Sequence, residues 1–298
     1  MFFSLVTFIF LIAQICKKIL IKVSVILPTY NRLYSLTRCV ESLISQTLDC
    51  KFWELIIVND GGKDVSDIQR LFDSNFNYNL VYQKNKGPAA ARNVGAEIAS
   101  GEILAFIDDD CMADSNWLLN ILSSVQEGDV IGGKVVNYYH NNNYSEASQL
   151  LIEYLYHINR GTQNSFFTTN NLALYRGDFM KLHGFSSSFK TSAGEDREFG
   201  VRANVNGMTH RIENSILVTH AHFLTAKTFF KLHKKYGYAA FHFHKEIAAL
   251  EQKIDTKPKF RFYYGLVTFP FQKKYSVQRR IYLCFLLFIS QFYVELGF

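Results

Sequence analysis

The chain has 298 residues, of which 48% are apolar and 19% charged, a composition that supports a sizeable core and excludes an intrinsically disordered protein. One large α/β domain with additions fits this length. The formal net charge of +6 favours anionic partners, such as lipid headgroups, a pyrophosphate-bearing substrate or nucleic acid, without choosing among them.

The cysteine and glycine patterns exclude several kinds of site. The five cysteines are scattered and never spaced as C-x-x-C, so we expect neither a disulfide framework nor a cysteine zinc site, and we predict a reducing compartment. The sequence also has no Walker A pattern and no G-x-G-x-x-G pattern. Any nucleotide must therefore be held in another way.

The N-terminal segment is apolar. Residues 1–16 are followed by Lys17 and Lys18, without a small-residue cleavage site. Counted through Ile21, the segment is marginal for a spanning helix, which needs roughly 20 apolar residues. We predict either a short anchor or membrane-lying helix, or a buried N-terminal element.

Short apolar strands alternate with helices from residue 22 onward. We predict strands at 23–27, 55–58, 80–82 and 103–107, and helices through 36–44 and 89–99. This order predicts an α/β fold with a Rossmann-like, mostly parallel sheet flanked by helices. In such sheets ligands bind at the carboxyl ends of the strands, and polar loops follow three of them, at Thr29, Asp60 and Asp108.

The second half is less regular. We predict strands at 130–131, 134–136 and 216–218, a helix at 146–159 that leads to residues 168–175, another helix after Gly194, and a basic aromatic helix at 224–251. Residues 281–298 are about long enough to span a bilayer, but Gln291 and Glu295 favour docking at its interface. The predicted divisions are an apolar segment at 1–21, an α/β domain at 22–223 and a helical, membrane-associating region at 224–298.

An acidic triplet, Asp108–Asp110, directly follows an apolar strand and should lie at the mouth of the sheet. Adjacent carboxylates repel one another unless a cation joins them. Their hard oxygen ligands suit Mg²⁺ or Mn²⁺, which bridges the phosphates of a nucleotide. The alternative is a solvated acidic turn.

Four segments, 25–32, 59–62, 91–95 and 108–110, together resemble family 2 glycosyltransferases of the GT-A fold, and the similarity covers roughly residues 22–222. The resemblance implies donor nucleotide-binding roles for a set of loop residues, which are Pro28, Thr29, Tyr30, Asn31, Asp60, Arg92, Asp108 and Asp109. Asp60 would hydrogen-bond the base, and a uracil imide suits such an acceptor, so a UDP-sugar is the expected donor. Asn59 and Gly62 depart from the family pattern and leave the base open.

The resemblance also implies a metal site for Mn²⁺ or Mg²⁺. Asp110 would be the direct ligand, with Asp108 nearer the ribose and Asp109 between them. His220 would complete the metal shell, with His222 as second choice. Arg92 would frame the donor site, unless it lies on a solvated helix face.

On the acceptor side, Asp196 matches the family's general base, which removes the proton of the attacking hydroxyl in an inverting transfer. Glu195 and Glu198 are alternatives for that role, and an exposed cluster of helix-capping acids is the competing interpretation. Glu195 and Asn171 would lie near the donor and acceptor sugars.

Three histidines, His233, His242 and His244, should be surface or interface residues of the basic aromatic helix. Membrane contact by this helix would use Lys231, Lys234 and Lys235 with Phe229, Phe230, Tyr236 and Tyr238, followed by Lys273, Lys274, Arg279 and Arg280 before the last apolar run.

We therefore expect a membrane-associated glycosyltransferase that faces the cytoplasm, with a nucleotide-sugar donor, a glycan or lipid-linked acceptor, and no nucleic-acid partner. One rival is a nucleotidyltransferase or another nucleotide-binding α/β enzyme. A second is a non-catalytic, membrane-attached binding protein of the same fold. The Pro28–Asn31 loop disfavours the first, which usually has a basic glycine-rich loop there.

Overall fold

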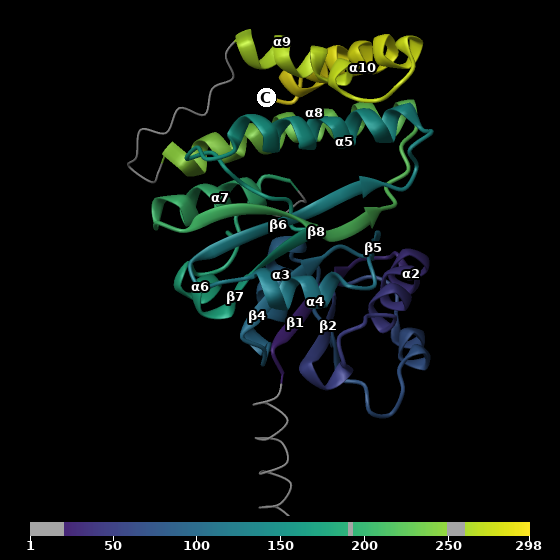
Figure 1. Ribbon diagram of the computed structural model, residues 1–298, viewed down its shortest axis with the longest axis vertical. Coiled ribbons are helices and arrows are strands. Elements are labelled where there is room, and N and C mark those ends of the chain that lie inside the picture. Colours follow the sequence, from purple (N-terminus) through teal and green to yellow (C-terminus); the bar gives the residue numbers. More distant parts are fainter. Residues whose placement is uncertain (1–20, 190–192, 249–259) are drawn as a thin grey trace, which may run out of the picture.

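The computed structural model describes residues 21–189, 193–248 and 260–298, so the apolar segment predicted at 1–16 lies outside the described residues. These residues form one eight-stranded sheet in the order β3-β2-β1-β4-β7-β6-β8-β5 (Figure 1). The strands are β1 (Val23–Thr29), β2 (Trp53–Asn59), β3 (Tyr78–Tyr82), β4 (Ile103–Ile107), β5 (Cys111–Ala113), β6 (Asp129–Asn137), β7 (Asn171–Tyr175) and β8 (Thr209–His220).

The sheet is α/β as predicted, but it is mixed rather than mostly parallel. The pairings β1–β2, β2–β3, β1–β4 and β6–β8 are parallel, whereas β4–β7, β6–β7 and β5–β8 are antiparallel. The reversal arises at β7, whose first residue pairs with Ile107 at the carboxyl end of β4. The strand therefore starts at the ligand-binding edge and runs away from it. Two strands predicted at 130–131 and 134–136 are a single strand with an irregularity between Gly133 and Lys134.

Helices cover both faces of the sheet. They are α2 (Leu33–Ile44), α3 (Pro88–Ile98), α4 (Trp117–Ser124), α6 (Arg176–Lys181) and α7 (Glu195–Val205), with short 3-10 helices at Cys50–Phe52, Ser66–Leu71 and Phe269–Gln272. One core lies between the sheet and α2 and α4, and a second lies on the opposite face with α3, α6 and α7. Every residue of β1, β2 and β4 is buried, in keeping with their largely apolar sequences, and the buried polar side chains of Ser24 and Glu54 are hydrogen-bonded to each other.

The helix α2 illustrates how the sequence pattern makes the layer. Its buried residues, Leu36, Cys39, Val40 and Leu43, repeat at the spacing of one helical face. On the other side of the sheet, a Cβ added at Gly95 of α3 would lie 2.6 Å from a methyl carbon of Ile26. Glycine at this position therefore lets α3 pack closely on β1.

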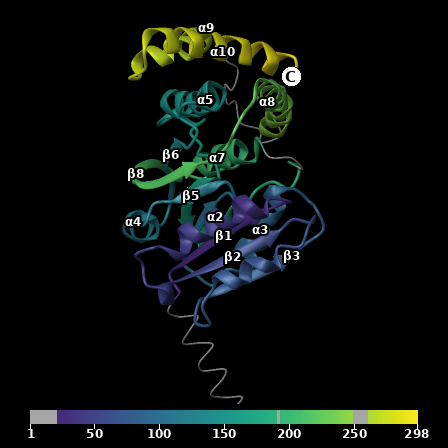
Figure 2. The same ribbon diagram turned by 90° about the vertical axis from the view of Figure 1, so that its right-hand side faces the viewer.

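Four further helices form a layer beyond the sheet: α5 (Asn143–Asn159), α8 (Ala226–Ala248), α9 (Phe260–Thr268) and α10 (Val277–Glu295). Figures 1 and 2 show α5 and α8 next to the sheet and α9 and α10 outermost. A third core joins these helices, and Lys273 pairs with Glu153 of α5 at 2.5 Å. The helices α8, α9 and α10 thus share a core with α5. A domain boundary after residue 223 stays a prediction.

Some of the aromatic residues of α8 are buried among the neighbouring helices and cannot form a membrane-facing surface, while contact of this region with a membrane stays a prediction. Phe229 and His233 are fully buried, and Phe230 stacks on Tyr293 of α10 with ring centroids 4.4 Å apart. His233, predicted to be at a surface or interface, hydrogen-bonds through Nδ1 to the carbonyl of Phe229 at 2.8 Å, and burial lowers its pKa to about 4. Of the aromatic residues predicted at the membrane, Tyr238 is clearly exposed.

The last helix, α10, packs one side on α8 and α5 and leaves the other side uncovered. A Cβ added at Gly237 of α8 would lie 1.9 Å from the carbonyl oxygen of Val294, so the two helices meet closely there. Across the described residues, no helix combines the length and the hydropathy needed to cross a membrane.

Candidate active site

The carboxyl ends of β1 and β4 are joined by side chains. These strands are parallel neighbours, and Thr29 at the end of β1 donates its hydroxyl to Oδ2 of Asp109 at 2.7 Å. Burial, reinforced by the adjacent carboxylate of Asp110, raises the pKa of Asp109 to about 6, although Arg32 and Thr29 oppose the shift. The middle acid of the triplet therefore points back into the loop and holds the strand ends together.

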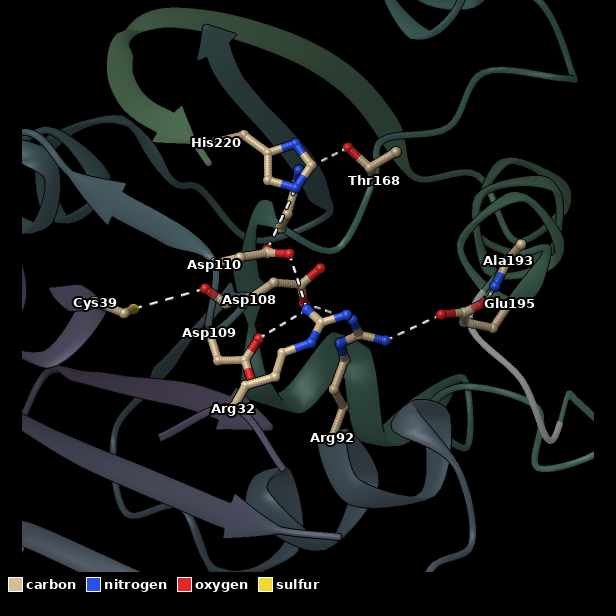
Figure 3. Close-up of polar contacts among 11 residues, drawn as sticks. Arg32, Cys39, Arg92, Asp108, Asp109, Asp110, Thr168, Ala193, Glu195 and His220 are labelled. Atoms are coloured by element: carbon tan, nitrogen blue, oxygen red, sulfur yellow. Dashed lines mark hydrogen bonds and ion pairs between the residues drawn. The ribbon is translucent and has the colours of Figure 1, made fainter. Parts of the chain in front are cut away.

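The Arg32 side chain lies next to the carboxylates of Asp109 and Asp110 and offsets their negative charge. Arg32 is the last residue of the first motif, and the sequence predicted no role for it. Nη1 of Arg32 lies 3.1 Å from Asp109 and 2.9 Å from Asp110 (Figure 3). Its side chain is 53% exposed, so it is free to move when another cation approaches. The position of Arg32, three residues after Thr29 in a polar loop, was the signal in the sequence.

Asp110 and His220 converge, as the resemblance implied. The residue after Asp110, Cys111, pairs with His220 in the β5–β8 ladder, and Nε2 of His220 lies 3.3 Å from Oδ1 of Asp110. Burial works against ionisation of Asp110, but His220 and Arg32 outweigh it and hold the pKa of Asp110 well below its usual range. In return, Asp110 raises the pKa of His220 against the effect of burial.

This pair fits a divalent cation. Ligand atoms of Asp110, Cys111 and His220 lie within 4.8 Å of one another. Burial raises the pKa of the Cys111 thiol well above its ordinary value, which disfavours the thiolate that a metal needs. A carboxylate and an imidazole are left as protein ligands. His222 also faces the cavity and lies next to His220, with ring centroids 5.4 Å apart, but it is outside the three-residue cluster.

Arg92 links Asp108, after the end of β4, to the acidic residues Glu195 and Asp196 at the start of α7, here called the acid motif. Its guanidinium contacts Oδ1 of Asp108 at 2.6 Å and Oε1 of Glu195 at 3.0 Å, and its side chain is 3% exposed (Figure 3). Burial disfavours the charge, but the two carboxylates outweigh burial and raise the pKa of Arg92. Arg92 is thus a buried bridge rather than a residue on a solvated helix face.

Asp60 organises the loop before α3. Its carboxylate accepts hydrogen bonds from Nε2 of Gln83 and from the backbone amides of Lys86 and Gly87, at 2.6, 2.9 and 2.9 Å. A carboxylate offers roughly four acceptor positions, so Asp60 retains capacity for a ligand. It lines the same cavity as Pro28, Thr29 and Tyr30.

Two of the residues predicted to contact ligands, Asn31 and Asn171, make structural hydrogen bonds and are not among the residues that line the cavity, and their ligand contacts stay predictions. Asn31 has a φ of 58° and its Oδ1 accepts from the amide of Lys63, which ties the first loop to the second and keeps Asn31 off the cavity wall. Asn171 is buried, and its amide bonds to the indole of Trp117 and to two backbone carbonyls. The preceding residues, Thr168, Thr169 and Asn170, do line the cavity.

Asp196 lies on the cavity wall in the first turn of α7, after Gly194 in a left-handed conformation with a φ of 99°. Burial and the adjacent Glu195 carboxylate raise the pKa of Asp196 to about 7. Glu195 is buried and bonds Arg92 and the amide of Ala193, whereas Glu198 pairs with Arg202 at 2.7 Å and does not line the cavity. Glu195 and Glu198 are therefore held by arginines rather than forming an exposed cap, whereas Asp196 lines the cavity and accepts a hydrogen bond from the backbone amide of Arg197.

The strand-end acids, Arg92, His220 and Asp196 border one cavity of about 1310 Å³. Its walls include the strand ends with Asp60, Asp108 and Asp110, and the start of α7 with Asp196. A second cation missed by sequence reasoning, Arg197, also lines it, 4.4 Å from the ring centroid of Phe243. Its place directly after the acid motif was the signal in the sequence.

Sequence comparison finds related proteins. The profile of the family described as Glycosyl transferase family 2 matches residues 24–184, more than half of the chain. The glycosyltransferase AglE of Haloferax volcanii is 36% identical over 124 residues, which are 40% of this chain and 41% of that protein. Validoxylamine A glucosyltransferase of Streptomyces hygroscopicus subsp. jinggangensis is 28% identical over 218 residues, 62% of this chain and 52% of that protein. The chain thus matches about half the length of these relatives.

Structure comparison shows the fold. The mannosyltransferase PcManGT of Pyrobaculum calidifontis, solved in complex with GDP-Man and Mn²⁺, superposes with a TM-score of 0.60 at 16% identity. The match covers 92% of this chain and 73% of that one. The GT-A type of α/β fold predicted from the sequence is confirmed.

Proposed function

Because the chain belongs to glycosyl transferase family 2, we propose that it transfers a sugar, with inversion, from a nucleoside diphosphate sugar to a glycan or lipid-linked acceptor, using Mn²⁺ or Mg²⁺. One observation carries the proposal. The acids at the strand ends and Asp196 line the same cavity, and Arg92 connects Asp108 with Glu195 between them.

The donor would lie over the strand ends. Asp60 has acceptor capacity for a base N–H, with UDP as the nucleotide that best suits it, and Tyr30, 49% exposed at the cavity, offers a ring beside it. Asp108 would face the ribose. In the fold relative with GDP-Man and Mn²⁺, a nucleotide sugar and a divalent ion occupy the protein together, which supports this use of the site.

Asp110 and His220 would hold the metal ion. When bound, such an ion neutralises charge on the diphosphate leaving group. Arg32 would leave Asp110 as the ion and the donor enter, since its exposed side chain is the cation that Asp110 contacts in the described structure. Asp109, committed to Thr29, would keep the loop in place throughout.

The acceptor hydroxyl would approach from the side of α7. Asp196 would accept its proton as the oxygen attacks the anomeric carbon on the face opposite the nucleotide. A pKa of about 7 suits this work, because the group is a stronger base than an ordinary carboxylate and is substantially ionised near neutral pH. Glu195, fixed by Arg92, would keep Asp196 in register and raise its basicity.

Attachment to a membrane surface at the cytoplasmic side would use the outermost helices. The outer face of α10 is apolar along its whole length, with Val277, Ile281, Phe285, Phe288, Phe292 and Leu296 all more than half exposed. Their spacings of three and four residues place them in one stripe, here called the α10 stripe. Phe260 and Tyr264 of α9 are 84% and 65% exposed beside them. A stripe of this kind on a helix too short or too polar to span suits the plane of a lipid interface.

The direct test is release of nucleoside diphosphate from a panel of nucleotide sugars. We expect one donor to be turned over with Mn²⁺ or Mg²⁺, and EDTA to stop the release. The Asp110→Asn variant should be inactive while folded, whereas Asp73→Asn, which alters an exposed acid outside the cavity, should match the wild type. Metal-independent release, or full activity of Asp110→Asn, would refute the proposal.

A further inference from the structure

The cavity does not end at the acid motif. Beyond Asp196 it continues between α5 and α8 to the inner sides of α9 and α10, and Figure 2 shows these two outer helices lying across the pair below. This part of the cavity is here called the apolar arm. Its lining includes Leu151, Leu155, Ala240, Phe243, Ile247 and Val294. These side chains offer apolar contact that a sugar does not need, although polar groups such as Gln149, Gln291 and Glu295 also border this part of the cavity.

The positively charged side chain of Arg197 lies between the polar part of the cavity, next to Asp196, and the apolar arm, next to Phe243. The guanidinium of Arg197 lies 4.4 Å from the ring centroid of Phe243 and 5.6 Å from that of Phe166. Within residues 21–189, 193–248 and 260–298, it makes no hydrogen bond or ion pair with another side chain, so its N–H groups remain available to a ligand in the cavity. Guanidinium groups bind phosphate oxygens with two parallel hydrogen bonds.

We propose that the apolar arm binds the hydrocarbon chain of the acceptor, and that Arg197 binds the phosphate that links this chain to the head group. The inference rests on the proposed function, and it narrows the acceptor from a glycan or lipid-linked molecule to a phosphate-linked lipid. The acceptor hydroxyl would then lie next to Asp196, the residue that precedes Arg197 in the first turn of α7.

The two sides of α10 are consistent with this route. Its outer side carries the α10 stripe, while Val294 on its inner side lines the apolar arm. A single helix therefore separates the surface suited to a membrane from the arm suited to one lipid chain. The residue after Val294, Glu295, accepts a hydrogen bond through Oε1 from the hydroxyl of Tyr263 of α9 at 3.1 Å, and both of these residues also line the cavity.

Binding of alkyl phosphates tests the proposal without any need for turnover. We would measure dodecyl phosphate and butyl phosphate, below the concentration at which either aggregates, by equilibrium dialysis. Each methylene buried contributes about fourfold in affinity, so burial of even half of the eight additional methylenes of dodecyl phosphate predicts at least about a 100-fold preference over butyl phosphate. Equal affinity for the two chains would overturn the proposal.

Matched variants locate the chain. Ala240→Trp should fill the apolar arm and remove the chain-length preference, whereas Tyr238→Trp, on the solvent side of the same helix, should keep it. Phe288→Ser with Phe292→Ser alters the α10 stripe and should also keep it. Loss of the preference in the stripe variant, with retention in Ala240→Trp, would mean that the alkyl chain binds to the outer surface.

A photoreactive alkyl phosphate with a diazirine at the chain end gives a second measurement on the wild-type chain. Mass spectrometry should find the label on residues of the apolar arm, and Arg197→Gln should weaken capture at a fixed probe concentration. Label confined to the α10 stripe would overturn the proposal. The Asp110→Asn variant should bind the probe like the wild type. Probe binding without sugar transfer would therefore count against the proposed function alone, and sugar transfer without chain binding against this inference alone.

Discussion

Replacing Arg92 with methionine should destabilise the fold through Glu195. The Glu195 side chain is 4% exposed and would keep one partner, the amide of Ala193 at 2.9 Å. Removal of one member of a buried ion pair costs about 3–5 kcal/mol, because the other charge is left uncompensated. Asp108 is 31% exposed, so its lost pairing should add no more than about 1 kcal/mol. We therefore expect Arg92→Met to lower the free energy of unfolding by about 3–5 kcal/mol.

Urea unfolding followed by tryptophan fluorescence measures this change, since both tryptophans, Trp53 and Trp117, are buried. The matched control is Arg70→Met, which removes an 83% exposed partner of Asp67 and should change stability by about 0–1 kcal/mol. Adding Glu195→Gln to Arg92→Met removes the stranded charge and should recover at least about 1 kcal/mol. A loss no larger than the control's, or no recovery in the double variant, would refute the reasoning.

Three further predictions concern activity and membrane binding. Asp110→Asn should reduce metal-stimulated turnover to background while its unfolding curve stays that of the wild type. Turnover that persists in the presence of a chelator would contradict this prediction. The rate should rise with pH up to about 7 and then level off, because the raised pKa of Asp196 keeps the base protonated below that pH; Asp196→Asn should lower turnover by roughly 10²–10⁴. Glu195→Gln should move this rise to lower pH, since it removes a like charge, and an unmoved profile would assign the rise to another group. In flotation with anionic liposomes at low salt, the wild type should float and the Phe288→Ser, Phe292→Ser variant should float less; equal behaviour would mean that the α10 stripe is not the docking surface.

The donor side of the site was predictable because its determinants are local. A buried strand followed at once by a polar loop places Thr29, Asp60 and Asp108 at one edge of the sheet, whatever the rest of the chain does. The sequence did not predict which residues the long arginine side chains would contact. Arg32 contacts acids and Arg197 contacts aromatic rings that come from distant segments of the chain. These contacts depend on how the segments pack in three dimensions.

The errors have equally specific causes. Asn170 lines the cavity, whereas Asn171 at the start of β7 bonds to Trp117 and two backbone carbonyls, and the sequence carries no signal that separates these two adjacent asparagines. The direction of β7 depends on where the chain returns after α5, and periodicity carries no information on that. On α8, by contrast, the buried residues Phe229, His233 and Phe243 follow a helical period, so the inward side of this helix could have been recognised.

The anomeric form of the sugar first released from an α-linked donor tests the central claim most directly. With water in place of the acceptor and Mn²⁺ present, attack assisted by Asp196 on the face opposite the nucleotide should give the β anomer, which proton NMR detects before mutarotation. Its formation should stop in EDTA and fall by roughly 10²–10⁴ in Asp196→Asn. First release of the α anomer, or release that neither treatment affects, would contradict an inverting, metal-dependent glycosyl transfer at this site.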